Sequence, residues 1–233
     1  MPDVRRILES QIGPKFLTID LPKSASQDIN TVLRTIMQDA VSVTYFLNGS
    51  VGNARLDPYV FSEYVVSIGC RLLDFHPLDA ENLKQPPERA CHMGLAVFLS
   101  TLYIQHGRRR FLKYGMVGAR LKSTIETCFE DVSAELMLWL LFLGGPSILA
   151  AIDESWLMPK IRTILEKLGL QTWQEVRSCL LAFPWICGLH DAPAATLYSD
   201  CFSSSKKVIS VQDATGFLQG SEKSSNISTC DPS

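Results

Sequence analysis

Apolar residues recur along this chain at three- and four-residue spacing, and the two-residue alternation of a half-buried β-strand is almost absent. Within residues 28–46, Ile29, Leu33 and Ile36 fall on one side of a helix. The same spacing returns in residues 57–75, 87–105 and 120–129. Residues 134–143 are apolar on every side, which is typical of a helix buried at the centre of a domain. The spacing predicts an all-α fold built as a single multi-helix domain.

Local signals predict where several of these helices begin and end. Pro159 fits the first turn of a helix, and Gly169 stands just beyond its end, where a residue with positive φ is common. Thr172 and Glu175 have the spacing of a capping box, so a further helix should begin there. Pro184 is expected to close that helix, because proline cannot continue the hydrogen-bond ladder.

Composition bounds the class of protein. The chain has 233 residues, of which 46% are hydrophobic, and a formal net charge of -2. A chain with so many apolar residues and so little net charge is not intrinsically disordered as a whole. After Phe202 the residues are mostly polar or small. We therefore expect an N-terminal helical segment over 1–55, a helical domain over 56–202 and a disordered tail over 203–233.

The cysteines argue for a reduced compartment without a bound metal. There are seven, widely scattered, and no CxxC pair occurs. Neither a zinc ribbon nor a redox dithiol is predicted, and free cysteine usually packs as a small hydrophobe. The first residues lack the apolar core of a secretory signal. We expect an intracellular protein with no metal and no cofactor.

Two apolar runs and one basic stretch are candidate binding features. The runs Cys91–Gln105 and Leu136–Ile152 are shorter than the roughly 20 residues of a membrane-spanning helix, so no membrane span is expected. A small membrane protein remains the least favoured alternative. The basic stretch has no acidic residue and is expected to be a solvated helix end and loop rather than a phosphate-binding patch; its members are Arg89, Arg108, Arg109, Arg110, Lys113, Arg120 and Lys122.

The residues Cys187, His190 and Asp191 have the composition of a nucleophile, a base and an orienting acid. Sequence neighbours rarely reach the geometry of a catalytic triad, so packing or capping is the favoured interpretation. The pair Cys91–His92 is weaker still, because adjacent side chains on a helix point apart. We predict no catalytic residue and no enzyme, and a helical enzyme stays open as an alternative.

The aromatic spacing after Ala134 resembles a known family. An apolar helix ends in FLGG, a helix led by tryptophan and a Leu-Gly-Leu break follow, and then comes Trp-x-Glu-Val, closed by an aromatic-tryptophan pair. This order is similar to the carboxy-terminal regulatory domain of fungus-specific transcription factors, over about residues 56–202. The matching residues, expected to lie in the core, are Trp139, Phe142, Gly144, Gly145, Trp156, Gly169, Trp173, Glu175, Val176, Leu180, Phe183 and Trp185.

The resemblance implies an all-α domain in a nuclear, pathway-specific transcription regulator, for example of a secondary-metabolite gene cluster. Full-length members carry an amino-terminal zinc cluster of six cysteines that binds DNA, whereas here the first cysteine is Cys70. Zinc binding and direct DNA binding are therefore not expected of this chain. It should act by associating with proteins, either other transcription factors or a second copy. The principal alternative is a helical enzyme of a biosynthetic pathway.

Overall fold

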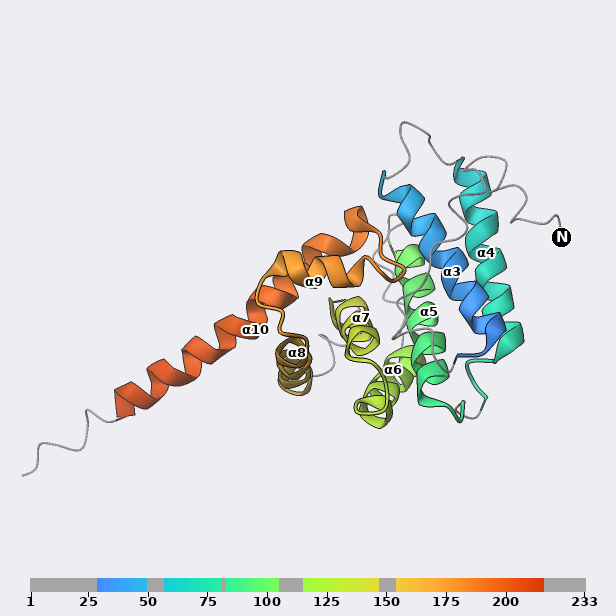
Figure 1. Ribbon diagram of the computed structural model, residues 1–233. Helices are drawn as coiled ribbons and strands as arrows, with labels where there is room; N and C mark the ends of the chain where they lie inside the picture. Colours follow the sequence, from blue (N-terminus) through green and yellow to red (C-terminus); the bar gives the residue numbers. More distant parts are fainter. Residues whose placement is uncertain (1–28, 50–56, 81–82, 105–114, 147–153, 216–233) are drawn as a thin grey trace, which may run out of the picture.

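The computed structural model describes residues 29–49, 57–80, 83–104, 115–146 and 154–215. This described part contains eight helices and no strand, which confirms the predicted all-α class (Figure 1). In chain order they are α3 (Thr31–Leu47), α4 (Pro58–Phe75), α5 (Pro86–Ile104), α6 (Gly115–Cys128), α7 (Ala134–Gly144), α8 (Glu154–Leu168), α9 (Trp173–Leu180) and α10 (Cys187–Thr215).

Helix α5 lies at the centre of the packing. It contacts α3 and α4 on one side and α6 and α7 on the other. Helix α7 in turn contacts α8, α9 and α10, which lie together at the opposite end of the molecule from α3 and α4 (Figure 1). Every residue of α7 from Leu136 to Gly144 is buried, as its uniformly apolar sequence predicts. A continuous hydrophobic core runs from Ile29 to Cys201 and joins all eight described helices.

Short polar side chains begin the helices. Asn30 accepts a hydrogen bond from the backbone N–H of Val32 (2.8 Å) at the start of α3. Asp57 accepts one from Tyr59 (2.7 Å) at the start of α4, where Pro58 occupies a position that needs no N–H. These bonds satisfy backbone donors that the first helical turn leaves unpaired.

The predicted break between α8 and α9 is confirmed. Gly169 adopts φ of 67°, a conformation that favours glycine, and Leu170 N–H returns to the carbonyl of Leu165 (3.0 Å). Thr172 and Glu175 then form the predicted capping box: the Thr172 hydroxyl accepts from Glu175 N–H (3.3 Å), and the Glu175 carboxylate accepts from Thr172 N–H (2.9 Å).

One predicted boundary is wrong. Helix α8 begins at Glu154, so Pro159 lies inside the helix rather than in its first turn. Proline costs the helix one backbone hydrogen bond. The helix continues because Leu157 and Ile161, on its other side, are completely buried in the core. Tertiary packing therefore outweighs the local helix-start signal at this position.

Several predictions fall partly or wholly outside the described residues. The boundary between residues 55 and 56, residues 1–28, the arginines at 108–110, Lys113 and residues 216–233 are outside them. Of the predicted tail, 203–233, the backbone of residues 203–215 continues α10. None of the described helices combines the length and hydropathy needed to cross a bilayer.

Candidate functional site

Trp139 of α7 is the centre of the residues that carry the family resemblance. Its indole is completely buried and stacks on Phe183, with ring centroids 5.3 Å apart and an interplanar angle of 13°. Its Nε1 donates a hydrogen bond to the carbonyl of Pro184 (3.1 Å). On its other side the ring packs against Gly94 of α5, where no side chain intervenes. Trp139 thus joins α5, α7 and the connection that follows α9.

The twelve residues of the family resemblance differ in how deeply they are buried. Eight of the twelve are buried, namely Trp139, Phe142, Gly144, Gly145, Val176, Leu180, Phe183 and Trp185. Trp156 and Trp173 are partly buried and pack against the core, with Trp173 6.3 Å from the ring of Phe142. Gly169 and Glu175 are exposed, because they end α8 and begin α9 rather than fill space.

His190 lies in a polar junction rather than beside a nucleophile. Its Nδ1 accepts a hydrogen bond from the backbone N–H of Ile186 (3.0 Å), and its Nε2 lies 3.0 Å from the hydroxyl of Thr101. That hydroxyl donates to the carbonyl of Phe98 (2.7 Å), so its oxygen accepts from Nε2–H. Burial lowers the pKa of His190 to about 4, so the ring is neutral near pH 7 and both of its nitrogens are occupied.

Cys187 and Asp191 pair with Arg177 of α9 instead of with His190. The Arg177 Nε–H donates to Asp191 (2.8 Å), and its Nη2 lies 3.1 Å from the Cys187 sulfur. The other carboxylate oxygen of Asp191 accepts from Trp185 Nε1–H (2.8 Å). Burial raises the pKa of the Cys187 thiol, which disfavours the reactive thiolate. This arrangement holds the start of α10 in place and gives no support to a cysteine nucleophile.

Asn48, which follows α3, also contacts the connection between α9 and α10. Its side-chain amide donates to the carbonyl of Trp185 (2.8 Å), and its side-chain oxygen accepts from the N–H of Cys187 (2.8 Å). The end of α3 is thereby tied to the α9–α10 connection. Asn48 and Cys187 are 139 residues apart, so no local pattern could have predicted that they meet.

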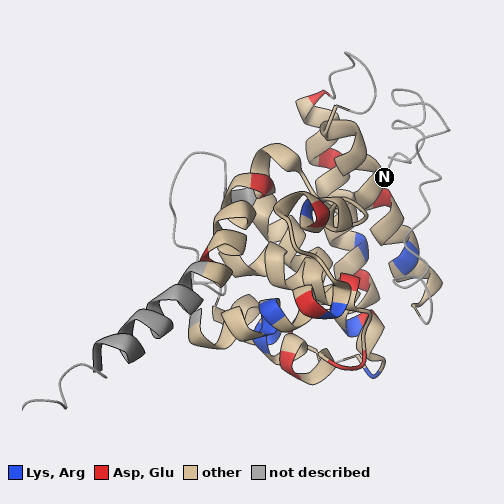
Figure 2. Cartoon of the chain, turned by 60° about the vertical axis from the view of Figure 1, so that its left-hand side comes forward, with Lys and Arg blue, Asp and Glu red and all other residues tan. Residues whose placement is uncertain are grey.

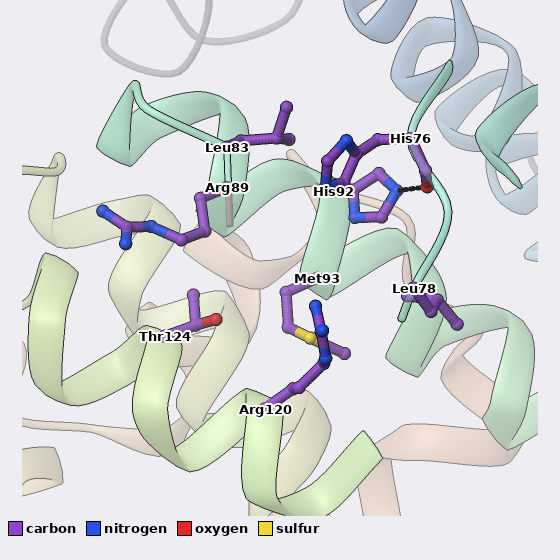
Figure 3. Close-up of a pocket in the computed structure, with 8 residues that line it drawn as sticks. All are labelled: His76, Leu78, Leu83, Arg89, His92, Met93, Arg120 and Thr124. Carbon is purple, nitrogen blue, oxygen red and sulfur yellow. Dashed lines mark hydrogen bonds between the residues drawn. The ribbon is translucent and has the colours of Figure 1, made fainter. Parts of the chain in front are cut away.

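A separate pocket lies between the α4–α5 connection, α5 and α6. It encloses about 290 Å³ of space, its open mouth included. It is lined by His76, Leu78, Leu83, Arg89, His92, Met93, Arg120 and Thr124 (Figure 3). Two members of the basic stretch, Arg89 and Arg120, therefore line one pocket with two histidines. From the sequence the basic stretch was expected to be solvated and His92 to pack or cap, so this pocket was not predicted.

Hydrogen bonds fix part of the pocket wall. His92 Nε2 lies 2.8 Å from the carbonyl of His76 and 3.3 Å from that of Leu72, so this nitrogen carries a hydrogen that carbonyls accept (Figure 3). Arg120 Nη2 donates to the carbonyl of Ala80 (2.8 Å). Burial lowers the pKa of His92, the two carbonyls oppose that shift, and His76 and Arg120 lower the pKa further.

One buried polar group of the pocket wall lacks a partner among the described contacts. The Nε of Arg89 is buried and has no hydrogen bond. The side chain of Thr124 is almost completely buried and lines the same pocket. An unsatisfied buried donor typically costs about 1–3 kcal/mol, so such groups call for a bound water or ligand.

Charges of both signs are mixed over the described part of the chain. Figure 2 shows lysine and arginine positions interspersed with aspartate and glutamate positions in that view, without one continuous basic face. Within the described ranges no group of three or more His, Cys, Asp or Glu side chains could hold a metal ion. Lys122 and Lys160 lie over the ring of Trp156, at 4.9 and 5.2 Å from its centroid.

Comparisons with known proteins add no relative. No protein-family model, no curated protein and no solved structure matches this chain. The likeness to the regulatory domain of fungus-specific transcription factors therefore stays a prediction, and it rests on the residues quoted for it.

Proposed function

We propose that this chain is a transcription regulator of fungal type that acts in the nucleus on one pathway, for example a secondary-metabolite gene cluster. The proposal is supported mainly by the packing of the resemblance residues against one another. Trp139 stacks on Phe183 although 44 positions separate them (183 − 139), and Phe142 lies against Trp173. A sequence pattern whose members pack together supports a common structural unit better than a scattered coincidence does.

Protein association is the proposed mode of action, and the exposed apolar residues of α4 support it. Helix α4 lies at the edge of the described helices (Figure 1). Three of its apolar residues, Tyr59, Val66 and Leu73, are exposed. These three apolar side chains are seven residues apart and are 71%, 46% and 47% exposed. A seven-residue apolar spacing on an exposed helix suits burial against another helix. Their exposure supports an associating domain, with another transcription factor or a second copy as partner.

Transcript profiling after gene deletion tests the proposal directly. The comparison is between the deletion strain and the same strain carrying the intact chain. We expect coherent loss of one co-regulated set of transcripts, restored by the intact chain. Unchanged transcripts together with one altered metabolite would contradict the proposal and favour a biosynthetic enzyme.

A surface variant tests the mode of action. Val66→Asp places a charge within the exposed apolar spacing of α4 without touching the core. We expect the deletion strain carrying this variant to lack the same transcripts, at unchanged protein level. Ser123→Asp adds the same charge at an exposed position of α6 and should restore them. Full restoration by Val66→Asp would remove α4 from the mechanism.

A further inference from the structure

We propose that the pocket between the α4–α5 connection, α5 and α6 binds a small oxyanion: inorganic phosphate or the phosphate group of a metabolite. The groups that would hold it are Arg89, Arg120, His92 and Thr124, from two helices. The proposal concerns binding alone and does not depend on the proposed regulatory function.

The charge of the lining selects an anion. Two arginines and two histidines line the pocket, and none of its described lining residues is acidic. The remaining lining residues, Leu78, Leu83 and Met93, are apolar (Figure 3). Charge-assisted hydrogen bonds are stronger in such partly desolvated surroundings than in water.

Arg89 supplies a guanidinium with free donors. Its Nε is buried without a partner, and the described residues offer its side chain no ion pair. Arg120 donates one hydrogen bond to the carbonyl of Ala80, and its guanidinium has further N–H donors. The planar fork of an arginine matches two oxygens of a phosphate group.

Thr124 and His92 add buried polar side chains to the pocket wall, which distinguishes the pocket from a charged patch on the surface. Both side chains are almost completely buried, with 3% and 5% of their surface exposed. Thr124 comes from α6, and its hydroxyl can donate a hydrogen bond. His92 Nε2 is held by the carbonyl of His76, which leaves Nδ1 on the other side of the ring (Figure 3). Protonation at Nδ1 would give the pocket a further donor.

The size of the pocket sets the kind of ligand. The figure of about 290 Å³ counts the open mouth and the solvent in it, so the enclosed space is well below that of a drug-sized ligand site, roughly 300–1,000 Å³. It suits one tetrahedral oxyanion or the phosphate end of a longer molecule that extends outward. An aromatic or long apolar ligand would not fit.

Anion binding should be linked to proton uptake by His92. Burial lowers its pKa, and the charged and titratable groups facing it across the pocket are His76, Arg89 and Arg120. A negatively charged ligand next to the ring stabilises its protonated form and therefore raises the pKa of His92. Sulfate does not titrate near neutral pH, so its affinity should rise as the pH falls toward the pKa of His92, which in the free chain lies below the ordinary 6.5.

Calorimetric titration of the full chain with inorganic phosphate and with sulfate tests the proposal. We expect saturable binding of one anion per chain. Arg89→Gln and Thr124→Val should each weaken it, by about tenfold for the arginine. Glycerol 3-phosphate, titrated alongside, distinguishes the sources: tighter binding than phosphate indicates a phosphorylated metabolite, and equal binding indicates free phosphate.

The matched control is Lys84→Gln, which removes one positive charge at an exposed neighbour that does not line the pocket. It should leave the affinity unchanged. Circular dichroism of each variant checks that the helices persist. Absence of saturable binding to the folded chain would overturn the proposal. Equal weakening by Lys84→Gln and Arg89→Gln would overturn it too, since it would reveal general charge attraction.

Discussion

Replacing Gly94 with alanine is the sharpest test of the central packing. An added Cβ would lie 2.7 Å from Cη2 and 3.0 Å from Cε3 of Trp139, and closer still to Cζ3. Carbon atoms in contact normally stay about 3.5–4.0 Å apart. The ring cannot retreat easily, because it is completely buried, stacked on Phe183 and hydrogen-bonded to Pro184. Helix α5 and α7 must therefore separate or the indole must tilt.

The expected magnitude follows from two opposing effects. Overpacking a core usually costs about 1–3 kcal/mol, and a backbone-to-ring clash belongs at the upper end. Alanine regains about 1 kcal/mol of helix propensity relative to glycine. We expect a net loss of about 2 kcal/mol in the free energy of unfolding, or about 4–8 °C in Tm for a chain of this size.

Urea unfolding followed by circular dichroism measures this loss. Gly69→Ala in α4 is the matched control, since its Cβ would meet only Leu99 Cδ1 at 3.9 Å. It should stabilise the chain by about 0.5–1 kcal/mol. Combining Gly94→Ala with Trp139→Phe should recover part of the cost, because the smaller ring leaves room. A Gly94→Ala chain as stable as the unmodified one would refute the packing described for Trp139.

Three further predictions concern the α3–α10 junction and the cysteines. Asn48→Asp should lower the free energy of unfolding by about 2 kcal/mol, because a carboxylate cannot donate to the carbonyl of Trp185; chemical unfolding near pH 7 measures it, and an unchanged midpoint would contradict the contact. The folded pKa of His190, about 4, lies below its ordinary 6.5, so the stability that the neutral ring contributes is complete above pH 6.5 and is lost as the pH falls toward 4. The loss should be at most about 1.4 kcal/mol per pH unit and absent from a His190→Gln chain, as unfolding curves at several pH values would reveal. Alkylation of the native chain, followed by mass spectrometry, should label exposed Cys70 long before Cys91, whose pKa burial raises to about 12; equal rates would contradict the burial of Cys91.

Much of the fold could be predicted because helix formation leaves local traces. The four apolar segments before residue 130 and the buried α7 follow directly from spacing. The Gly169 end and the Thr172 capping box depend on residues within one turn of each other, and both are observed. Pro159 misled the boundary of α8, because its local preference lost to the burial of Leu157 and Ile161.

The sites were far less predictable, because their parts come from distant segments. Cys187, His190 and Asp191 suggested chemistry by composition, yet Arg177 and Thr101 decide what they do. The basic stretch was recognised, but its sequence does not say that Arg89 and Arg120 share a pocket. A contact between helices depends on how each is rotated and placed, which no spacing within one helix records.

The secondary-structure class, the most deeply buried helix and the capped helix ends can be read from the sequence, since each depends on interactions within a few residues. The contacts of Asn48 with the start of α10 and of Trp139 with Gly94 follow only from how the helices pack together. The same packing brings Thr124 and His92 into one pocket. The physical reason is that hydrogen bonding and close packing across helices depend on ångström-scale placement, which is set by the whole core at once.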